Sequence, residues 1–363
     1  MPKEIITSKQ AICIIIMFLF GSSVVMGVNS DFCQDTWIAL LCSMVIVIPI
    51  ILVYARIMKL YPGKDIFDII EHLFGRLWGN MIIILIILYA LHLGSMVLRN
   101  FSEFIKVVSM DKTPELVLMI GMTIITSYLA KSGIEVVARW SVVIFPITLG
   151  VVFITIVLSL NNMNFNNILP FMDHSLADLS KTAYSIFSFP FAETVLFLAI
   201  ANSIKKTDSP YKIYLYAIIW GLILFLIIIL RNLFILGAPM IRSVYFPSYT
   251  AARLINVGDF LTRIEGSITI NFILAGITKI TVCLLAASKG IAHIFKVNDY
   301  HNIVVPTNLI ILAICSIVYN NITQMFEFIQ VYSIYTIPFQ IVIPLLIWIT
   351  AEIKKKSPPL QSV

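Results

Sequence analysis

The chain has 363 residues, of which 60% are hydrophobic and 12% charged. Soluble domains carry about 45–50% apolar and about 25% charged residues, so this composition excludes an ordinary soluble protein. The net charge of +6 comes from Lys and Arg that lie between long apolar stretches. Such a distribution indicates membrane topology and does not indicate nucleic-acid binding.

Ten apolar stretches have about the length that a helix needs to cross a bilayer. They are residues 11–28, 37–58, 80–98, 115–130, 140–160, 183–202, 213–236, 267–288, 303–319 and 328–350. Apolar and polar residues do not alternate within them, which excludes a membrane barrel. We therefore expect an all-α polytopic membrane protein with ten transmembrane helices in a single domain, 1–363.

Lys and Arg lie unequally on the two sides of these spans. With the connections assigned alternately to the two sides, 16 of the 25 lie on the side of both termini, 8 lie on the other, and Lys279 lies inside a span. The richer side is normally cytoplasmic, so we expect both termini in the cytoplasm. The outer connection 237–266 carries an amphipathic stretch after Pro247, which predicts a short helix.

Ten spans divide into two sets of five with opposite orientation, residues 1–160 and 161–363. This is the arrangement of inverted-repeat transporters, in which the first helix of each half is often broken near mid-membrane. Gly21, Ser22 and Ser23 lie in the middle of the first span, and Pro190 interrupts the sixth. Since Pro removes a backbone donor and clashes with the preceding turn, we expect broken first and sixth helices with a ligand cavity between them. An ordinary packing kink is the alternative at each position.

Two charged residues lie inside apolar spans. Glu193 follows Pro190 by three residues, and Lys279 lies near the centre of the eighth span. A charge at mid-membrane costs about 3 kcal/mol or more and needs a reason. Glu193 would complement the dipole of the new half-helix, contact a ligand ammonium group or join a gating ion pair. Lys279 needs an acidic partner, carbonyl groups or water.

The sequence contains no pattern typical of an enzyme. The five Cys residues lack metal-ligand spacing, and we expect them to pack in the interior. A Gly-rich phosphate loop and a nucleophile–His–acid set are both missing from the sequence. We therefore expect no catalytic residue, no cofactor, no metal and no nucleic-acid partner.

Several motifs occur in an order that resembles a known family. They are "ITSKQ" before the first span, "YPGKDIFDIIEHLFGRLWG", Thr113-Pro114, "GIEVVARWSVVIFP", Leu169-Pro170, "FPFAE" and "FPSYTAARLINVGDFLTRIE". Together they resemble the B subunits of endospore germinant receptors, the spore germination permease family. This family lies within the amino acid–polyamine–organocation transporter superfamily, and the resemblance covers essentially the whole chain.

The resemblance implies a transporter-like subunit in the spore inner membrane or cell membrane. Subunits of this kind bind amino acids or other small nutrients and work with an A-type membrane subunit and a C-type lipoprotein. Three functions are consistent with it: a nutrient-recognition subunit that signals by conformational change, a secondary transporter of amino acids or related small solutes, and a scaffold that binds no nutrient.

The resemblance also implies a place for the ligand. The third span, with Tyr89, His92 and Met96 at helical spacing, lines the pocket in this fold, although such residues are often ordinary core residues. In sodium-coupled relatives a cation site lies between the first and eighth helices, and the Lys279 ammonium group would replace that ion; a structural ion pair is the alternative. The candidate ligand-binding residues are Gly21, Ser22, Ser23, Tyr89, His92, Met96, Ser188, Phe189, Pro190, Glu193, Gly276 and Lys279.

Overall fold

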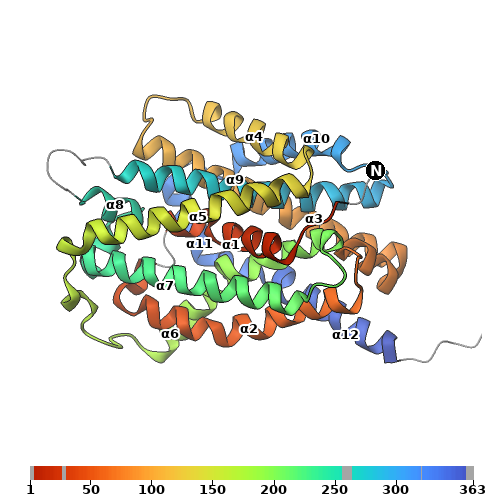
Figure 1. The fold of residues 1–363 in the computed structure, drawn as a ribbon, viewed down its shortest axis with the longest axis horizontal. Coiled ribbons are helices and arrows are strands. Elements are labelled where there is room, and N and C mark those ends of the chain that lie inside the picture. The colour runs from red at the N-terminus through yellow and green to blue at the C-terminus, as the bar shows by residue number, and fades with distance from the viewer. Residues whose placement is uncertain (1–3, 27–29, 256–263, 320, 357–363) are drawn as a thin grey trace, which may run out of the picture.

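Helices make up the regular structure of the chain. The computed structural model describes residues 4–26, 30–255, 264–319 and 321–356, and no β-strand occurs among them. The α-helices are α1 (Ser8–Met26), α2 (Thr36–Leu60), α3 (Ile66–Val108), α4 (Glu115–Lys131), α5 (Ile134–Ser159), α6 (Leu176–Ile186), α7 (Pro210–Ser243), α8 (Pro247–Arg253), α9 (Glu265–Phe295), α10 (His301–Val318), α11 (Ile322–Tyr335) and α12 (Ile343–Lys356), arranged as in Figure 1. The shorter 3₁₀ and π-helical segments are η1 (Ser30–Asp35), η2 (Leu160–Asn162), η3 (Phe165–Ile168), η4 (Phe187–Phe191), η5 (Ala192–Ser203) and η6 (Pro338–Val342). The expected all-α fold is confirmed.

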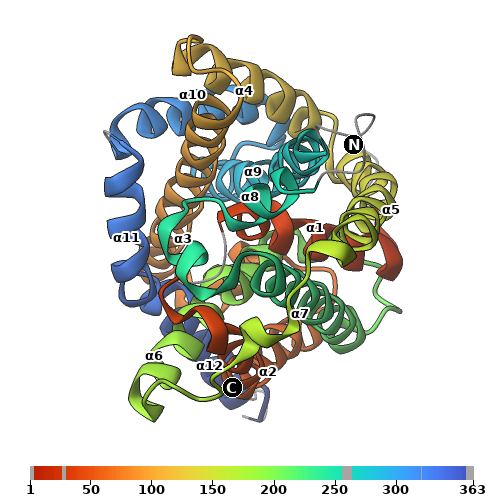
Figure 2. The same ribbon diagram turned by 90° about the vertical axis from the view of Figure 1, so that its left-hand side faces the viewer.

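Two helices, α1 and α9, form the centre of the bundle. They pack against each other, and α9 also packs along α3. Figure 2 shows α1 and α9 in the middle of the bundle, with α4, α10, α11, α2, α7 and α5 around them. Nearly all side chains from Ala11 to Ser23 and from Ala275 to Gly290 are buried. Helices that are apolar on every side belong in a core, which explains their position.

The surrounding helices expose large apolar side chains on their outward faces. Val45 of α2, Phe153 of α5 and Ile317 of α10 are 76%, 68% and 79% exposed. A surface of this kind matches lipid rather than water. Within the described residues, eight helical segments are long and apolar enough to cross a membrane. The expected spans 11–28 and 115–130, which fall on α1 and α4, are not among the eight, so ten spans remain a prediction.

The expected break of the first helix at Gly21–Ser23 is wrong for the described residues, because α1 continues to Met26. The Ser23 hydroxyl donates to the Leu19 carbonyl one turn earlier, at 3.0 Å. A Cβ atom at Gly21 would lie 2.6 Å from Cβ of Lys279. Gly21 therefore allows α1 and α9 to approach closely and does not unwind the helix, in keeping with the role of small residues between membrane helices.

The expected break of the sixth helix is confirmed. Between α6 and η5 the backbone of Phe189, at φ −130° and ψ 114°, leaves the helical region. Pro190 follows directly and cannot donate to the preceding turn. The chain resumes as η5, and Glu193 lies in its first turn.

Two glycines bend long helices at their ends. Gly75 in α3 has a φ of 72° and Gly237 in α7 has a φ of 67°. Residues with a side chain rarely adopt such values, which explains glycine at both positions. The short helix expected after Pro247 is present as α8. Gly258, Phe260 and Arg263 of the motif that begins at Phe246 lie outside the described residues.

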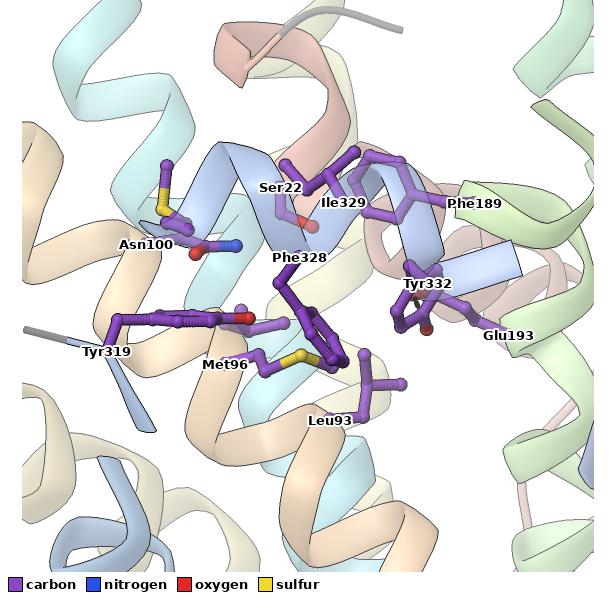
Figure 3. A pocket seen from close by; sticks show the side chains of 12 residues that line it. Ser22, Leu93, Met96, Asn100, Phe189, Glu193, Tyr319, Phe328, Ile329 and Tyr332 are labelled. Atoms are coloured by element: carbon purple, nitrogen blue, oxygen red, sulfur yellow. Dashed lines mark hydrogen bonds between the residues drawn. The ribbon is translucent and has the colours of Figure 1, made fainter. Parts of the chain in front are cut away.

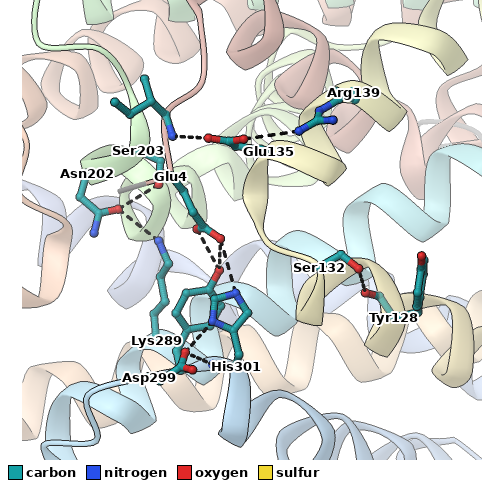
Figure 4. A network of polar contacts seen from close by, with 12 residues as sticks. Glu4, Tyr128, Ser132, Glu135, Arg139, Asn202, Ser203, Lys289, Asp299 and His301 are labelled. Atoms are coloured by element: carbon teal, nitrogen blue, oxygen red, sulfur yellow. Dashed lines mark hydrogen bonds and ion pairs between the residues drawn. The ribbon is translucent and has the colours of Figure 1, made fainter. Parts of the chain in front are cut away.

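The connections that are predicted to be cytoplasmic lie together at one end of the bundle. Both ends of the described chain lie at this end as well (Figure 1). The backbone N–H of Ile6 donates to the Ser203 carbonyl at 2.8 Å. Figure 4 shows the Glu4 carboxylate beside His301, and it also accepts from the Tyr300 hydroxyl at 3.0 Å. Hydrogen bonds from His301 hold the pKa of Asp299 below its ordinary value. The N-terminal segment thereby ties the connections after η5 and after α9 together.

This arrangement predicts which residues share a side of the membrane. In a cysteine-free background, Ser132→Cys, Lys205→Cys and Lys296→Cys should resist a membrane-impermeant maleimide until the cells are permeabilised. Leu176→Cys, at the start of α6 and 74% exposed, should react in intact cells, because the basic end is expected inside. Labelling of Leu176→Cys and Ser132→Cys from the same side would contradict this topology.

Candidate functional site

A buried ion pair lies where α1, α9 and η5 meet. Nζ of Lys279 lies 2.5 Å from Oε2 of Glu193 and donates to Oγ of Ser22 at 3.0 Å. All three side chains are fully buried. The ring centroids of Phe18 and Phe189 lie 5.2 and 5.0 Å from the same nitrogen, within the range of cation–π attraction. The acidic partner that Lys279 requires is Glu193.

Local structure explains why these charges meet. The interruption at Phe189 puts Glu193 in the first turn of η5, where a carboxylate complements the helix dipole. Lys279 lies in the fully buried part of α9, beside Gly21 of α1. One buried charge without a partner would cost about 3–5 kcal/mol, which the pairing avoids.

The second oxygen of Glu193 belongs to a hydrogen-bond network that extends toward the C-terminus. Tyr332 donates its hydroxyl hydrogen to Oε1 of Glu193 at 2.5 Å. The hydroxyl oxygens of Tyr332 and Tyr89 lie 3.4 Å apart. Nε2 of Gln340 donates to the Tyr89 hydroxyl at 3.0 Å and to the Ser188 carbonyl at 2.9 Å. The network therefore joins α3, α11 and η6 to the interrupted sixth helix.

A cavity lies against Glu193, the acidic member of this ion pair (Figure 3). Its volume is about 30 Å³, counted as space open to the centre of a water molecule. This is enough for a water molecule, which needs about 10–15 Å³ by that measure. Its lining is mostly apolar and aromatic, with the ion pair at one side: Ser22, Leu93, Met96, Val97, Asn100, Phe189, Glu193, Tyr319, Met325, Phe328, Ile329 and Tyr332. A concave apolar site with few polar groups is typical of small-molecule binding.

Seven of the twelve candidate residues come together here. Ser22, Met96, Phe189 and Glu193 line the cavity, and Lys279 contacts two of them. Tyr89 and Ser188 lie in the hydrogen-bond network beside it. The interrupted sixth helix, the third span and the eighth span therefore converge as the sequence predicts, although their role in ligand binding remains a prediction.

The other five candidates lie outside the lining of this cavity. Gly21 packs under the Lys279 side chain, and Ser23 bonds back to its own helix. His92 makes edge contacts with the rings of Phe328 and Tyr335, and its Nδ1 atom is buried with no hydrogen-bond partner among the described residues. Pro190 is buried, and Gly276 packs against the ring of Phe101. A role of these five in ligand binding, like that of the other seven, remains a prediction.

Sequence reasoning missed the contribution of the last span. Tyr332, Thr336 and Gln340 recur at intervals of four residues, so they share one face of that span. The Thr336 hydroxyl lies 2.6 Å from that of Ser188. A polar face in an otherwise apolar span that also contains Pro338 is the sequence feature that could have revealed this contribution. No group of three or more His, Cys, Asp or Glu that could hold a metal ion occurs in the described ranges.

A family model described as "Spore germination protein" matches residues 5–325. The chain belongs to this family. The spore germination protein KB of Bacillus subtilis (strain 168) is 26% identical over 362 residues, which cover 98% of this chain and 97% of that protein. The spore germination protein YndE of the same organism is 26% identical, with 81% and 82% covered. The predicted membership of the germinant receptor B-type permease family is thereby confirmed.

Two solved transporter structures share the fold of this family member. The nucleobase-cation-symport-1 family transporter Mhp1, in a closed conformation with bromovinylhydantoin bound, matches with a TM-score of 0.68 at 12% identity, over 95% of this chain and 78% of that chain. MhsT in complex with L-phenylalanine matches with a TM-score of 0.60 at 11% identity, over 93% and 87%. Family and fold are therefore of the transporter or receptor type.

Removal of one charge of the buried pair should destabilise the protein. We expect Lys279→Met and Glu193→Gln each to cost about 3–5 kcal/mol, because each leaves an uncompensated polar or charged group in the core. The double variant should recover most of that loss. Thermal unfolding of the purified proteins in detergent, followed by fluorescence-detected size-exclusion chromatography, measures both effects.

Arg139→Met is the matched control. Arg139 pairs with Glu135 four residues earlier, and these side chains are 70% and 41% exposed. An exposed pair contributes little, so this variant should unfold close to the wild-type temperature. Wild-type stability of both Lys279→Met and Glu193→Gln would show that the pair does not hold the core together.

Proposed function

We propose that this chain is the nutrient-recognition subunit of a spore germinant receptor and that it signals by a change of conformation. One observation carries the proposal: an apolar cavity lies against the Lys279–Glu193 ion pair, beside the interruption of the sixth helix. A ligand in this cavity would contact both the only lining carboxylate, Glu193, and the backbone freed at Phe189. Membership of the spore germination protein family supports the biological setting.

The chemistry of the lining favours an amino acid with an apolar side chain. Leu93, Met96, Val97, Phe328 and Ile329 would surround such a side chain. The charged groups of a zwitterion need partners of opposite charge, and the ion pair supplies one of each. The ligand carboxylate would form an ion pair with the Lys279 ammonium group, and the ligand ammonium group would form one with the Glu193 carboxylate.

This exchange of partners would couple binding to conformation. The direct Lys279–Glu193 contact joins α9 to η5, and Tyr332 extends it to α11. A cavity of about 30 Å³ accepts water but must widen to accept an amino acid. Binding therefore selects a state in which η5 and α11 stand farther from α9, since a ligand shifts an equilibrium toward the state that it binds better.

The wider setting is part of the same proposal. We infer that α1 and α4 complete ten spans in a five-plus-five inverted repeat, residues 1–160 and 161–363, with both termini in the cytoplasm. The subunit would lie in the spore inner membrane and act with an A-type membrane subunit and a C-type lipoprotein.

A secondary transporter of amino acids or related small solutes is the second candidate. The fold shared with Mhp1 and MhsT favours it. Uptake of radiolabelled amino acids into proteoliposomes that contain the purified chain separates the two candidates. Saturable uptake that Ile329→Trp weakens at equal protein level would favour transport, whereas binding without uptake would favour recognition.

A large side chain placed in the cavity should weaken the nutrient response. Ile329 lines the cavity and is half-buried, so Ile329→Trp would fill the space that the ligand needs. In spores that carry this receptor alone, we expect the nutrient concentration for half-maximal release of dipicolinic acid to rise by about tenfold or more, a loss of about 1.4 kcal/mol in binding.

Ile334→Trp provides the control on the same helix. Ile334 is 68% exposed on the outward face of α11 and does not line the cavity. It should leave the dose–response curve unchanged at equal protein level. An unmoved curve for Ile329→Trp at normal protein level would exclude this cavity as the nutrient site.

A further inference from the structure

A second pocket lies at the end of the bundle that carries the termini. The C-terminal end of α2, the connection to α3 and the segment between η5 and α7 surround it. Its volume is about 380 Å³, within the range of about 300–1,000 Å³ that small-molecule sites occupy. Four lysines line it, Lys59, Lys64, Lys205 and Lys206, and Asp208 is the one acidic residue in the lining.

Within the described part of the chain, the lysines of this pocket form no ion pair. None of the four lysines has a carboxylate within 4.0 Å among the residues that the structure describes. Asp208 accepts a hydrogen bond from the backbone N–H of Ser8 at 2.9 Å. Like charges gathered around one concave surface repel one another and raise the local concentration of anions.

Local contacts hold the lysines around the pocket. Nζ of Lys59 lies 5.3 Å from the ring centroid of Tyr211, and Nζ of Lys64 lies 6.0 Å from that of Tyr61. The stem of Lys206 lies against Gly63, where a Cβ atom would come within 2.7 Å of Cε of the lysine. A general excess of basic residues on one side of a membrane would spread over all connections, whereas these four converge on one cavity.

The position of the pocket relative to exposed aromatic side chains indicates the class of its ligand. Along α7, Tyr216 and Trp220 follow the pocket and are 54% and 45% exposed on the outward face. Aromatic residues of this kind mark the interface between lipid and water. Farther along α2, Val45 is 76% exposed among apolar neighbours. The pocket therefore lies on the headgroup side of these aromatic residues, at one end of α2 and α7. Both helices lie at the edge of the bundle (Figure 2).

We propose that this pocket binds the phosphate of an anionic phospholipid, held by Lys59, Lys64, Lys205 and Lys206. The phosphate group is compact and negatively charged, and ammonium groups bind it as point charges. Basic pockets between membrane helices on the cytoplasmic side bind anionic headgroups for the same reason. The proposal is independent of the nutrient cavity, since the two sites share no lining residue.

Lipid titration of the purified full chain tests the proposal. In mixed micelles, phosphatidylglycerol should raise the unfolding temperature of the wild-type protein, and phosphatidylcholine should not. A basic residue contributes about fivefold to binding at an anionic surface, so Lys205→Gln/Lys206→Gln should raise the half-saturating phosphatidylglycerol concentration by about 25-fold. Replacement of all four lysines by Gln should raise the half-saturating phosphatidylglycerol concentration roughly several hundredfold. Replacement of all four by Arg should retain binding, because Arg also binds phosphate.

A charge-matched control removes four basic residues at the same end that do not line the pocket: Lys9, Arg76, Lys296 and Lys355 to Gln. It should bind phosphatidylglycerol nearly as well as the wild-type protein. Loss of binding equal to that of the pocket variant would overturn the proposal in favour of general surface charge. Stabilisation by inorganic phosphate alone, with no response to phosphatidylglycerol, would overturn the lipid as the source of the phosphate.

Discussion

The buried contact between Lys279 and Glu193 organises the interior of this protein. It joins residues that lie 86 positions apart in the sequence and belong to helices that are mostly apolar. Neither charge would be tolerated alone in a core of this kind, since an unpaired buried ion is strongly destabilising. The pair therefore fixes where η5 lies along α9, and Ser22 ties α1 to the same point.

Two different local features of the backbone make this contact possible: a helix interruption and a glycine that allows close packing. On the α6 side, the chain leaves the helix at Phe189 and restarts after Pro190, which brings the Glu193 carboxylate to the start of η5. On the α1 side the helix stays intact through Ser23, and Gly21 leaves room for the stem of Lys279. The first and sixth spans therefore reach this contact differently, because a glycine that permits close packing brings helices together without unwinding.

The proposed nutrient cavity and the lysine-lined pocket differ in their physical character. The first is small, mostly apolar and adjacent to charges that neutralise each other, so a ligand must compete with an existing contact. The second is wide, positively charged and at headgroup depth, so an anion relieves repulsion without displacing a partner. Under the two proposals, ligand binding at the first site changes the conformation, and lipid binding at the second anchors the bundle in the bilayer.

The amino-acid sequence was sufficient to predict the helical membrane class, the family and the break of the sixth helix at Pro190. Apolar runs of sufficient length can only be helices in lipid, and Pro190 removes a donor wherever it stands. It also located Glu193 and Lys279 as residues that need partners. The packing of the helices was needed to show that these two residues are partners of each other, that Gly21 packs and does not unwind the helix, and that Tyr332 and Gln340 complete the network. Each of these outcomes depends on which faces of distant helices meet, and the spacing of residues within one helix does not contain that information.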